Sequence, residues 1–147
     1  MELKEKLNED LKVAMKAGDA LKTSTIRMLK SAINNAEMAK KKSFSDEEVF
    51  NVILSSIKQH RDSINQYKQG NRPELVAQEE AELVILQAYL PAQMSEEELR
   101  TLVAKVIAET GATAVKDMGK VIGKIMPLIK GRADNSIVSS IVKENLK

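Results

Sequence analysis

Apolar residues recur every three or four positions along almost the whole chain, and this spacing is the feature that most constrains the fold. Leu3, Leu7 and Leu11 open the pattern, and Val49, Ile53 and Ile57 repeat it. Such spacing places apolar side chains on one face of an α-helix. No stretch alternates apolar and polar residues for long enough to indicate a strand. The sequence therefore predicts an all-α fold.

Helix boundaries are marked by capping signals. Ser45 with Glu48, and Ser95 with Glu98, have the spacing of capping boxes, and Asp134 is a further N-cap. Gly18, Gly70 and Gly111 follow apolar stretches as stops. The expected helices span about 2–17, 20–41, 45–68, 73–89, 95–109 and 115–130, with a short last helix after Asp134. Gly119, Gly123 and Pro127 make the sixth the least regular.

Pro91 and Ser95 bracket the natural division of the chain. It separates an N-terminal four-helix domain, residues 1–93, from a smaller three-helix C-terminal domain, residues 94–147.

Composition excludes several classes of site. The chain has 147 residues with no cysteine and one histidine, so thiolate or histidine-rich metal sites and cysteine nucleophiles are absent. Aromatic residues make up 3%, too few for a base-stacking surface. No nucleotide-binding or hydrolase motif is present. We therefore expect no catalytic residue, no metal and no cofactor.

Targeting signals are also absent from the sequence. The chain opens with charged residues, and its longest apolar stretches are too short to span a bilayer. These observations predict a cytoplasmic protein that does not enter a membrane.

Basic residues gather near the end of the chain. Residues 115–147 contain seven basic and three acidic side chains. Lys116, Lys120 and Lys124 recur every fourth residue and would share one helix face, as a phosphate-binding surface or as an ordinary solvated face. Gly119 and Gly123 lie one turn apart. Their lack of side chains allows either tight packing against another helix or close approach of a partner.

A second basic track follows the third predicted helix and its exit, through Lys58, Arg61, Lys68 and Arg72. His60 beside it is interpreted as an ordinary surface or half-buried histidine, and Glu79, Glu80 and Glu82 as solvated. Arg27 is expected to pair with a carboxylate on a neighbouring helix, or else to contact a partner.

Several motifs resemble the GatB/YqeY family over essentially the whole chain. They are Ser24–Leu29, Gln66–Tyr67 with Gly70–Arg72, Tyr89–Pro91, Met118–Ile122 and Gly131–Asp134. Ile122 stands where the family more often has Met, a change that conserves volume. In that family, a similar helical module forms the tail of the B subunit of glutamine-dependent aminoacyl-tRNA amidotransferases. It is also appended to some glutaminyl-tRNA synthetases.

The resemblance implies a tRNA-affinity module without chemistry of its own. The family label carries a carbon–nitrogen ligase activity with glutamine as amide donor, but the catalytic parts of such complexes lie outside a chain like this one. The family motif points to Gly119, Lys120, Gly123, Gly131, Arg132 and Asp134, the last as a helix cap.

Residue chemistry and family motif together give one set of expected RNA contacts: Lys116, Gly119, Lys120, Gly123, Lys124, Lys130, Gly131 and Arg132. Three functions stay open. The chain is a tRNA-binding accessory protein, a module that docks onto an amidotransferase or aminoacyl-tRNA synthetase without touching RNA, or an enzyme with unrecognised chemistry.

Overall fold

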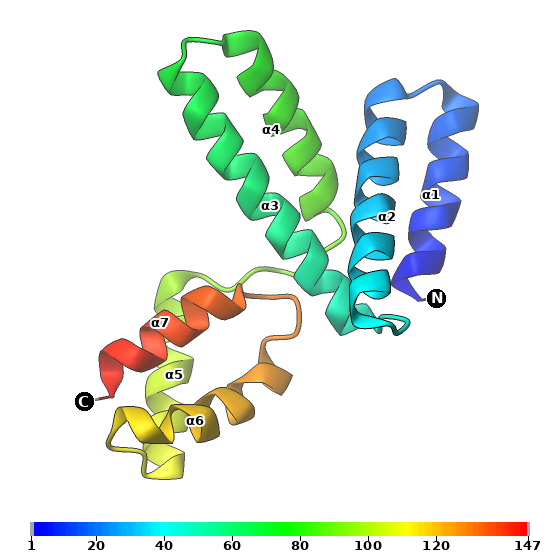
Figure 1. Ribbon diagram of the computed structural model, residues 1–147. Coiled ribbons are helices and arrows are strands. Elements are labelled where there is room, and N and C mark those ends of the chain that lie inside the picture. The colour runs from blue at the N-terminus through cyan, green and yellow to red at the C-terminus, as the bar shows by residue number, and fades with distance from the viewer. Residues whose placement is uncertain (1, 147) are drawn as a thin grey trace. The chain divides into compact units, whose positions relative to one another are not determined.

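The computed structural model of the protein describes residues 2–146 (Figure 1). Across that range the chain forms seven α-helices and two short 3-10 segments, and it contains no strand. The predicted all-α class is confirmed. The chain divides into two compact units, one ending at Leu90 and the other beginning at Pro91. The sequence placed this boundary after residue 93.

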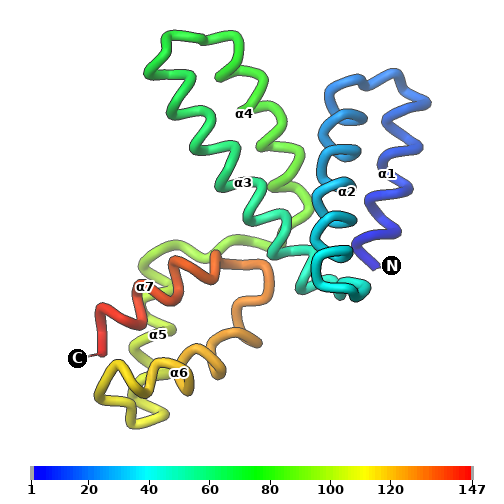
Figure 2. The backbone as a smooth tube through the Cα atoms, in the orientation of Figure 1, coloured from blue at the N-terminus to red at the C-terminus, as the bar shows by residue number. Residues whose placement is uncertain are grey.

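The first unit consists of two helical hairpins, which are easiest to follow in Figure 2. One pairs α1 (Leu3–Ala17) with α2 (Ala20–Lys40), and the other pairs α3 (Asp46–Gln69) with α4 (Pro73–Gln87). Their apolar faces form one core, which contains Leu3, Leu7, Ile26, Leu29, Ile33, Phe44, Val49, Ile53, Ile57, Leu86 and Tyr89. Beyond Ile57, α3 continues past this core with α4 beside it.

Helix ends in this unit follow the local signals. The Ser45 hydroxyl accepts a hydrogen bond from the Glu48 backbone N–H, and the Glu48 carboxylate accepts one from the Ser45 backbone N–H. The predicted capping box is therefore confirmed. Gly18 is left-handed with φ +70°, as a C-terminal glycine stop requires. Gly70 instead has φ −82°, and Asn71 is the left-handed residue, with φ +55°. Asparagine tolerates this conformation better than most side chains.

A partly buried hydrogen bond joins the beginning of this unit to its end. The Tyr89 hydroxyl donates to Asp10 Oδ2 over 2.6 Å, and Lys6 Nζ lies 3.2 Å from the same oxygen. Burial raises the pKa of Tyr89, and the hydrogen bond to Asp10 raises it further. The tyrosine therefore stays protonated and holds α1 against the segment after α4.

The second unit has its own core. Its α-helices are α5 (Glu96–Thr110), α6 (Met118–Ile125) and α7 (Asn135–Asn145), and the short 3-10 segments η1 (Val115–Asp117) and η2 (Met126–Leu128) flank α6. The buried side chains are Leu99, Val103, Val106, Val121, Ile125, Ile129, Ala133, Val138, Ile141, Val142 and Leu146. Because each unit has a separate core, each has its own source of stability.

Two local features of the second unit differ from the sequence-based predictions. The single helix expected over 115–130 is α-helical only over Met118–Ile125, with η1 before it and η2 after it. Pro127 lacks the N–H that would continue the α-helical ladder, and the chain tightens to a 3-10 turn there. The second capping box is half formed, because Ser95 caps the Glu98 backbone N–H without a reciprocal bond. Asp134 caps α7 through the Ser136 N–H, as predicted.

The helices of residues 2–146 also bear on membrane crossing. None of the helices there combines the length and the apolar character that a membrane span requires.

Candidate nucleic-acid interface

The α6 segment has one buried and one exposed face. Val121 and Ile125 are completely buried in the core of the second unit. The opposite side is exposed, and it carries Lys116 of η1 and Gly119, Lys120, Gly123 and Lys124 of α6. We call these five residues the lysine–glycine face. Local periodicity produces it, since the exposed positions are separated by three or four residues.

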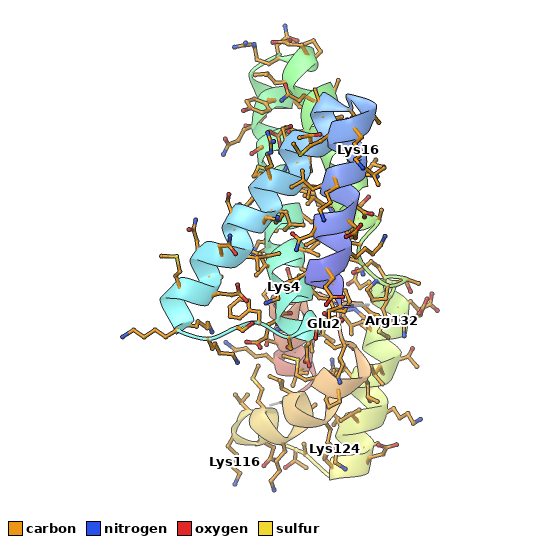
Figure 3. All side chains as sticks on the ribbon, turned by 90° about the vertical axis from the view of Figure 1, so that its right-hand side faces the viewer. Glu2, Lys4, Lys16, Lys116, Lys124 and Arg132 are labelled. Carbon is orange, nitrogen blue, oxygen red and sulfur yellow. The ribbon has the colours of Figure 1, made fainter. Side chains whose placement is uncertain are left out.

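Lysines on this face make no direct ion pair with the described carboxylates. In Figure 3, Lys116 and Lys124 lie along the segment that contains α6, and Arg132 lies apart from both. No ion pair among residues 2–146 involves Lys116, Lys120 or Lys124. Like charges on one helix face repel each other, and an anion placed over them relieves that repulsion.

Asp117 is the acidic residue within this segment, and the backbone already uses its carboxylate. Oδ2 accepts from the Thr113 N–H over 3.2 Å and from the Ala114 N–H over 3.4 Å. These bonds, together with the charges of Lys120 and Lys116, hold the pKa of Asp117 below its usual value. Asp117 is therefore an ionised cap for the turn that leads into α6.

Gly119 and Gly123 face open space. A Cβ atom built on either glycine meets nothing within 4 Å. The tight-packing explanation for these glycines is therefore wrong, and the alternative of close approach by a partner remains. Both adopt ordinary helical backbone, so the conformation does not itself require glycine.

Of the three RNA contacts expected at residues 130–132, one side chain is exposed and the other two residues make hydrogen bonds within the second unit. Lys130 is exposed in the turn before α7. Gly131 is buried with φ +70°, and its carbonyl accepts a 2.6 Å hydrogen bond from Gln93 Nε2. Arg132 is half-buried, and its Nε donates to the Ala92 carbonyl over 2.9 Å. Gly131 and Arg132 thus connect the beginning of the second unit to the turn before α7. Both residues lie outside the lysine–glycine face.

The second basic track lies on the first unit. Lys58, Arg61 and Lys68 are exposed on α3, and Arg72 is exposed in the turn that follows. Arg72 Nε lies 2.7 Å from Glu74 Oε1, so its charge is already partnered. A binding role for this second basic track stays a prediction.

Arg27 does not make the expected ion pair. It is exposed on α2, and its Nη2 contacts Met15 Sδ at 3.7 Å. Within residues 2–146 no carboxylate lies within ion-pairing distance of it. The partner-contact alternative for Arg27 therefore remains.

The burial of His60 differs most from the sequence-based prediction. Only 7% of it is exposed, and it contacts Glu79 and Glu82, which are half-buried rather than solvated. The signal was present in the sequence, because His60 continues the buried positions Ile53 and Ile57 at helical spacing. Glu80, the third member of the acidic cluster, is exposed as expected.

Comparison with known proteins identifies the relatives of this chain. A family model described as Yqey-like protein matches residues 4–146. "Altered inheritance of mitochondria protein 41, mitochondrial" from Vanderwaltozyma polyspora is 33% identical, over 96% of this chain and 80% of that protein. Proteins of the same name from Pyrenophora tritici-repentis and Saccharomyces cerevisiae are 33% and 32% identical, over 95% and 94% of this chain and 78% and 80% of theirs.

These relatives contradict the expected cytoplasmic location, because their names place them in mitochondria. The prediction was wrong in its reasoning as well as its result. It inferred a compartment from missing signals, although an all-helical domain of ordinary composition is compatible with either compartment.

Proposed function

The chain belongs to the YqeY-like protein family. We propose that its second unit binds tRNA as a non-catalytic accessory to tRNA-dependent amidation. The lysine–glycine face provides the contact surface. Its lysines bind phosphates, and its glycines let the nucleic-acid backbone approach the helix closely.

One observation carries this proposal: three exposed lysines that form no ion pair within residues 2–146 share a face with two glycines whose Cβ positions are open. Phosphate contacts dominate the affinity of most nucleic-acid interfaces. RNA of defined shape is recognised largely through phosphates and 2′-hydroxyls, so such a surface does not need aromatic side chains. Lys130, in the turn beyond η2, is a further candidate phosphate contact.

A second candidate function is docking onto an amidotransferase or aminoacyl-tRNA synthetase without RNA contact. The observation that favours it is the exposure of two apolar side chains, Val115 and Leu128, in the 3-10 segments on either side of α6. Apolar side chains beside a charged face are common at protein interfaces. The two functions differ in their response to salt.

We expect binding to bulk cellular tRNA to weaken steeply as salt rises. If Lys116, Lys120, Lys124 and Lys130 each contact one phosphate, affinity falls about 50- to 150-fold between 50 and 200 mM salt, because each contact releases condensed counterions. Fluorescence anisotropy with labelled tRNA measures this slope. Tight binding that is nearly independent of salt would contradict phosphate recognition. No binding at low salt would leave protein docking as the function to test.

Replacing both glycines by alanine separates binding from folding. Gly119→Ala and Gly123→Ala place methyl groups in open space, and each is expected to stabilise the second unit by about 0.5–1 kcal/mol through helix propensity. The same methyl groups obstruct close approach, so tRNA affinity should fall while stability rises. Urea unfolding and tRNA anisotropy on the same samples measure both effects.

The matched control for this pair is Thr101→Ala, at an exposed position of α5. It also raises helix propensity, but it lies outside the lysine–glycine face, so tRNA affinity should not change. If the glycine variants bind tRNA as tightly as the unaltered chain, the glycines do not act by close approach.

A further inference from the structure

His60 on α3 faces two carboxylates on α4, and its hydrogen bonding defines the chemistry of the cluster. Nδ1 lies 2.8 Å from the Ser56 carbonyl oxygen, one turn earlier on α3. A carbonyl oxygen can only accept, so Nδ1 carries the ring proton. In a neutral imidazole, Nε2 then presents a lone pair. Nε2 lies 3.1 Å from Glu82 Oε2, within hydrogen-bonding distance when this nitrogen is protonated, and 3.6 Å from Glu79 Oε2.

A lone pair and two carboxylate oxygens repel each other at these distances, and the cluster is withdrawn from water. The His60, Glu79 and Glu82 side chains are 8%, 22% and 12% exposed. Positive charge between the three groups relieves this repulsion, either as a proton on Nε2 that bonds Glu82 or as a metal ion. A proton on Nε2 would bond Glu82 but leave the longer contact to Glu79 unmade. A metal ion can bind all three groups at once.

We propose that His60, Glu79 and Glu82 bind a zinc ion between α3 and α4. Zinc bonds nitrogen and oxygen ligands at about 2.0–2.2 Å, so two ligands of a tetrahedral site lie about 3.3–3.6 Å apart. The two Nε2 to carboxylate distances lie close to this range, and all three ligand atoms lie within 4.8 Å of one another. Small side-chain rotations of the glutamates complete the site.

The surroundings of the histidine are those of a metal ligand. A ligating imidazole usually donates its other N–H to a backbone carbonyl or carboxylate, which fixes the ring and raises its basicity. The Nδ1 bond to Ser56 has this form. Glu79 and Glu82 are separated by three positions and face one direction from α4, a common way to build metal sites between facing helices. Three protein ligands leave one tetrahedral position for water.

Zinc binding to the untagged, chelator-treated chain tests the proposal, since an affinity tag would add histidines to a protein that has one. Competition with a chromophoric chelator should give one zinc per chain, with a Kd on the order of 1 µM or tighter. Glu82→Gln and Glu79→Gln keep the side-chain shape and should each weaken binding at least about tenfold. Glu80→Gln removes an exposed carboxylate from the same helix and should change nothing.

The single histidine also gives a direct spectroscopic measurement. On addition of zinc, the nitrogen NMR signal of His60 Nε2 should move while Nδ1 keeps its proton. Absence of zinc binding at 1:1 stoichiometry overturns the proposal. Unchanged affinity in both glutamine variants overturns it too, as does an imidazolium signal that zinc leaves unaffected. The cluster lies in the first unit, so these outcomes are independent of tRNA binding by the second.

Discussion

Lys120→Glu together with Lys124→Glu should reduce tRNA affinity at least about tenfold and leave folding intact. Both side chains are exposed, and neither takes part in an ion pair among residues 2–146. Reversal removes two phosphate contacts and adds repulsion at the same positions. The slope of log affinity against log salt should fall by about two. Anisotropy at several salt concentrations, with thermal unfolding of the same samples, measures both effects.

A matched pair of substitutions controls for overall charge. Lys105→Glu with Lys143→Glu reverses two exposed lysines of the same unit, on α5 and α7, outside the lysine–glycine face. Each pair changes the net charge of the chain from +2 to −2. If the control pair weakens binding equally, tRNA responds to net charge and not to this face. If the Lys120 and Lys124 pair unfolds the second unit, those lysines have a structural role.

Ile125→Ala should unfold most of the second unit at 37 °C and leave the first unit folded. Ile125 is completely buried, and truncating a buried isoleucine costs about 2–5 kcal/mol. The second unit begins at Pro91 and is small, and a single core of this size supplies about 3–5 kcal/mol. Amide hydrogen exchange resolved by residue should show lost protection after Pro91 and retained protection before it. Binding to tRNA should disappear with the fold.

The reciprocal control is Leu29→Ala in the core of the first unit. Leu29 is 1% exposed, so its truncation is a comparable loss of buried volume. Protection should fall in α1–α4, while tRNA binding by the second unit should persist. One shared unfolding transition in both variants would contradict two independently stabilised units. Loss of tRNA binding in Leu29→Ala, with the second unit still protected, would instead assign the contact to the first unit.

Local signals allowed most helices to be predicted. Apolar spacing identifies a helix because side chains three and four positions apart share a face, whatever the helix packs against. Ser45 and Asp134 cap their helices through atoms within three residues, so their roles could be predicted from neighbouring residues alone. The exposed position of Lys120 and Lys124 follows from the same periodicity, since Val121 and Ile125 occupy the opposite face.

Contacts between distant residues could not be predicted in this way. Arg132 bonds the Ala92 carbonyl, and Gly131 accepts from Gln93, across about 40 positions of sequence. Nothing near 131 or 132 in the sequence distinguishes these bonds from solvent or phosphate contacts. The same limit applies to Gly119 and Gly123, where only the packing of the second unit decides whether a neighbour fills the space beside them.

Patterns within the sequence were enough to establish the helical class, most helix ends and the family to which the chain belongs. These depend on periodicity, capping and residue identity, which act over a few residues or are read directly from them. Only the tertiary structure placed His60 beside Glu79 and Glu82, because it brings α3 and α4 together as a hairpin. A side chain's charge partner depends on which helix lies opposite, and that is decided by packing of the whole unit.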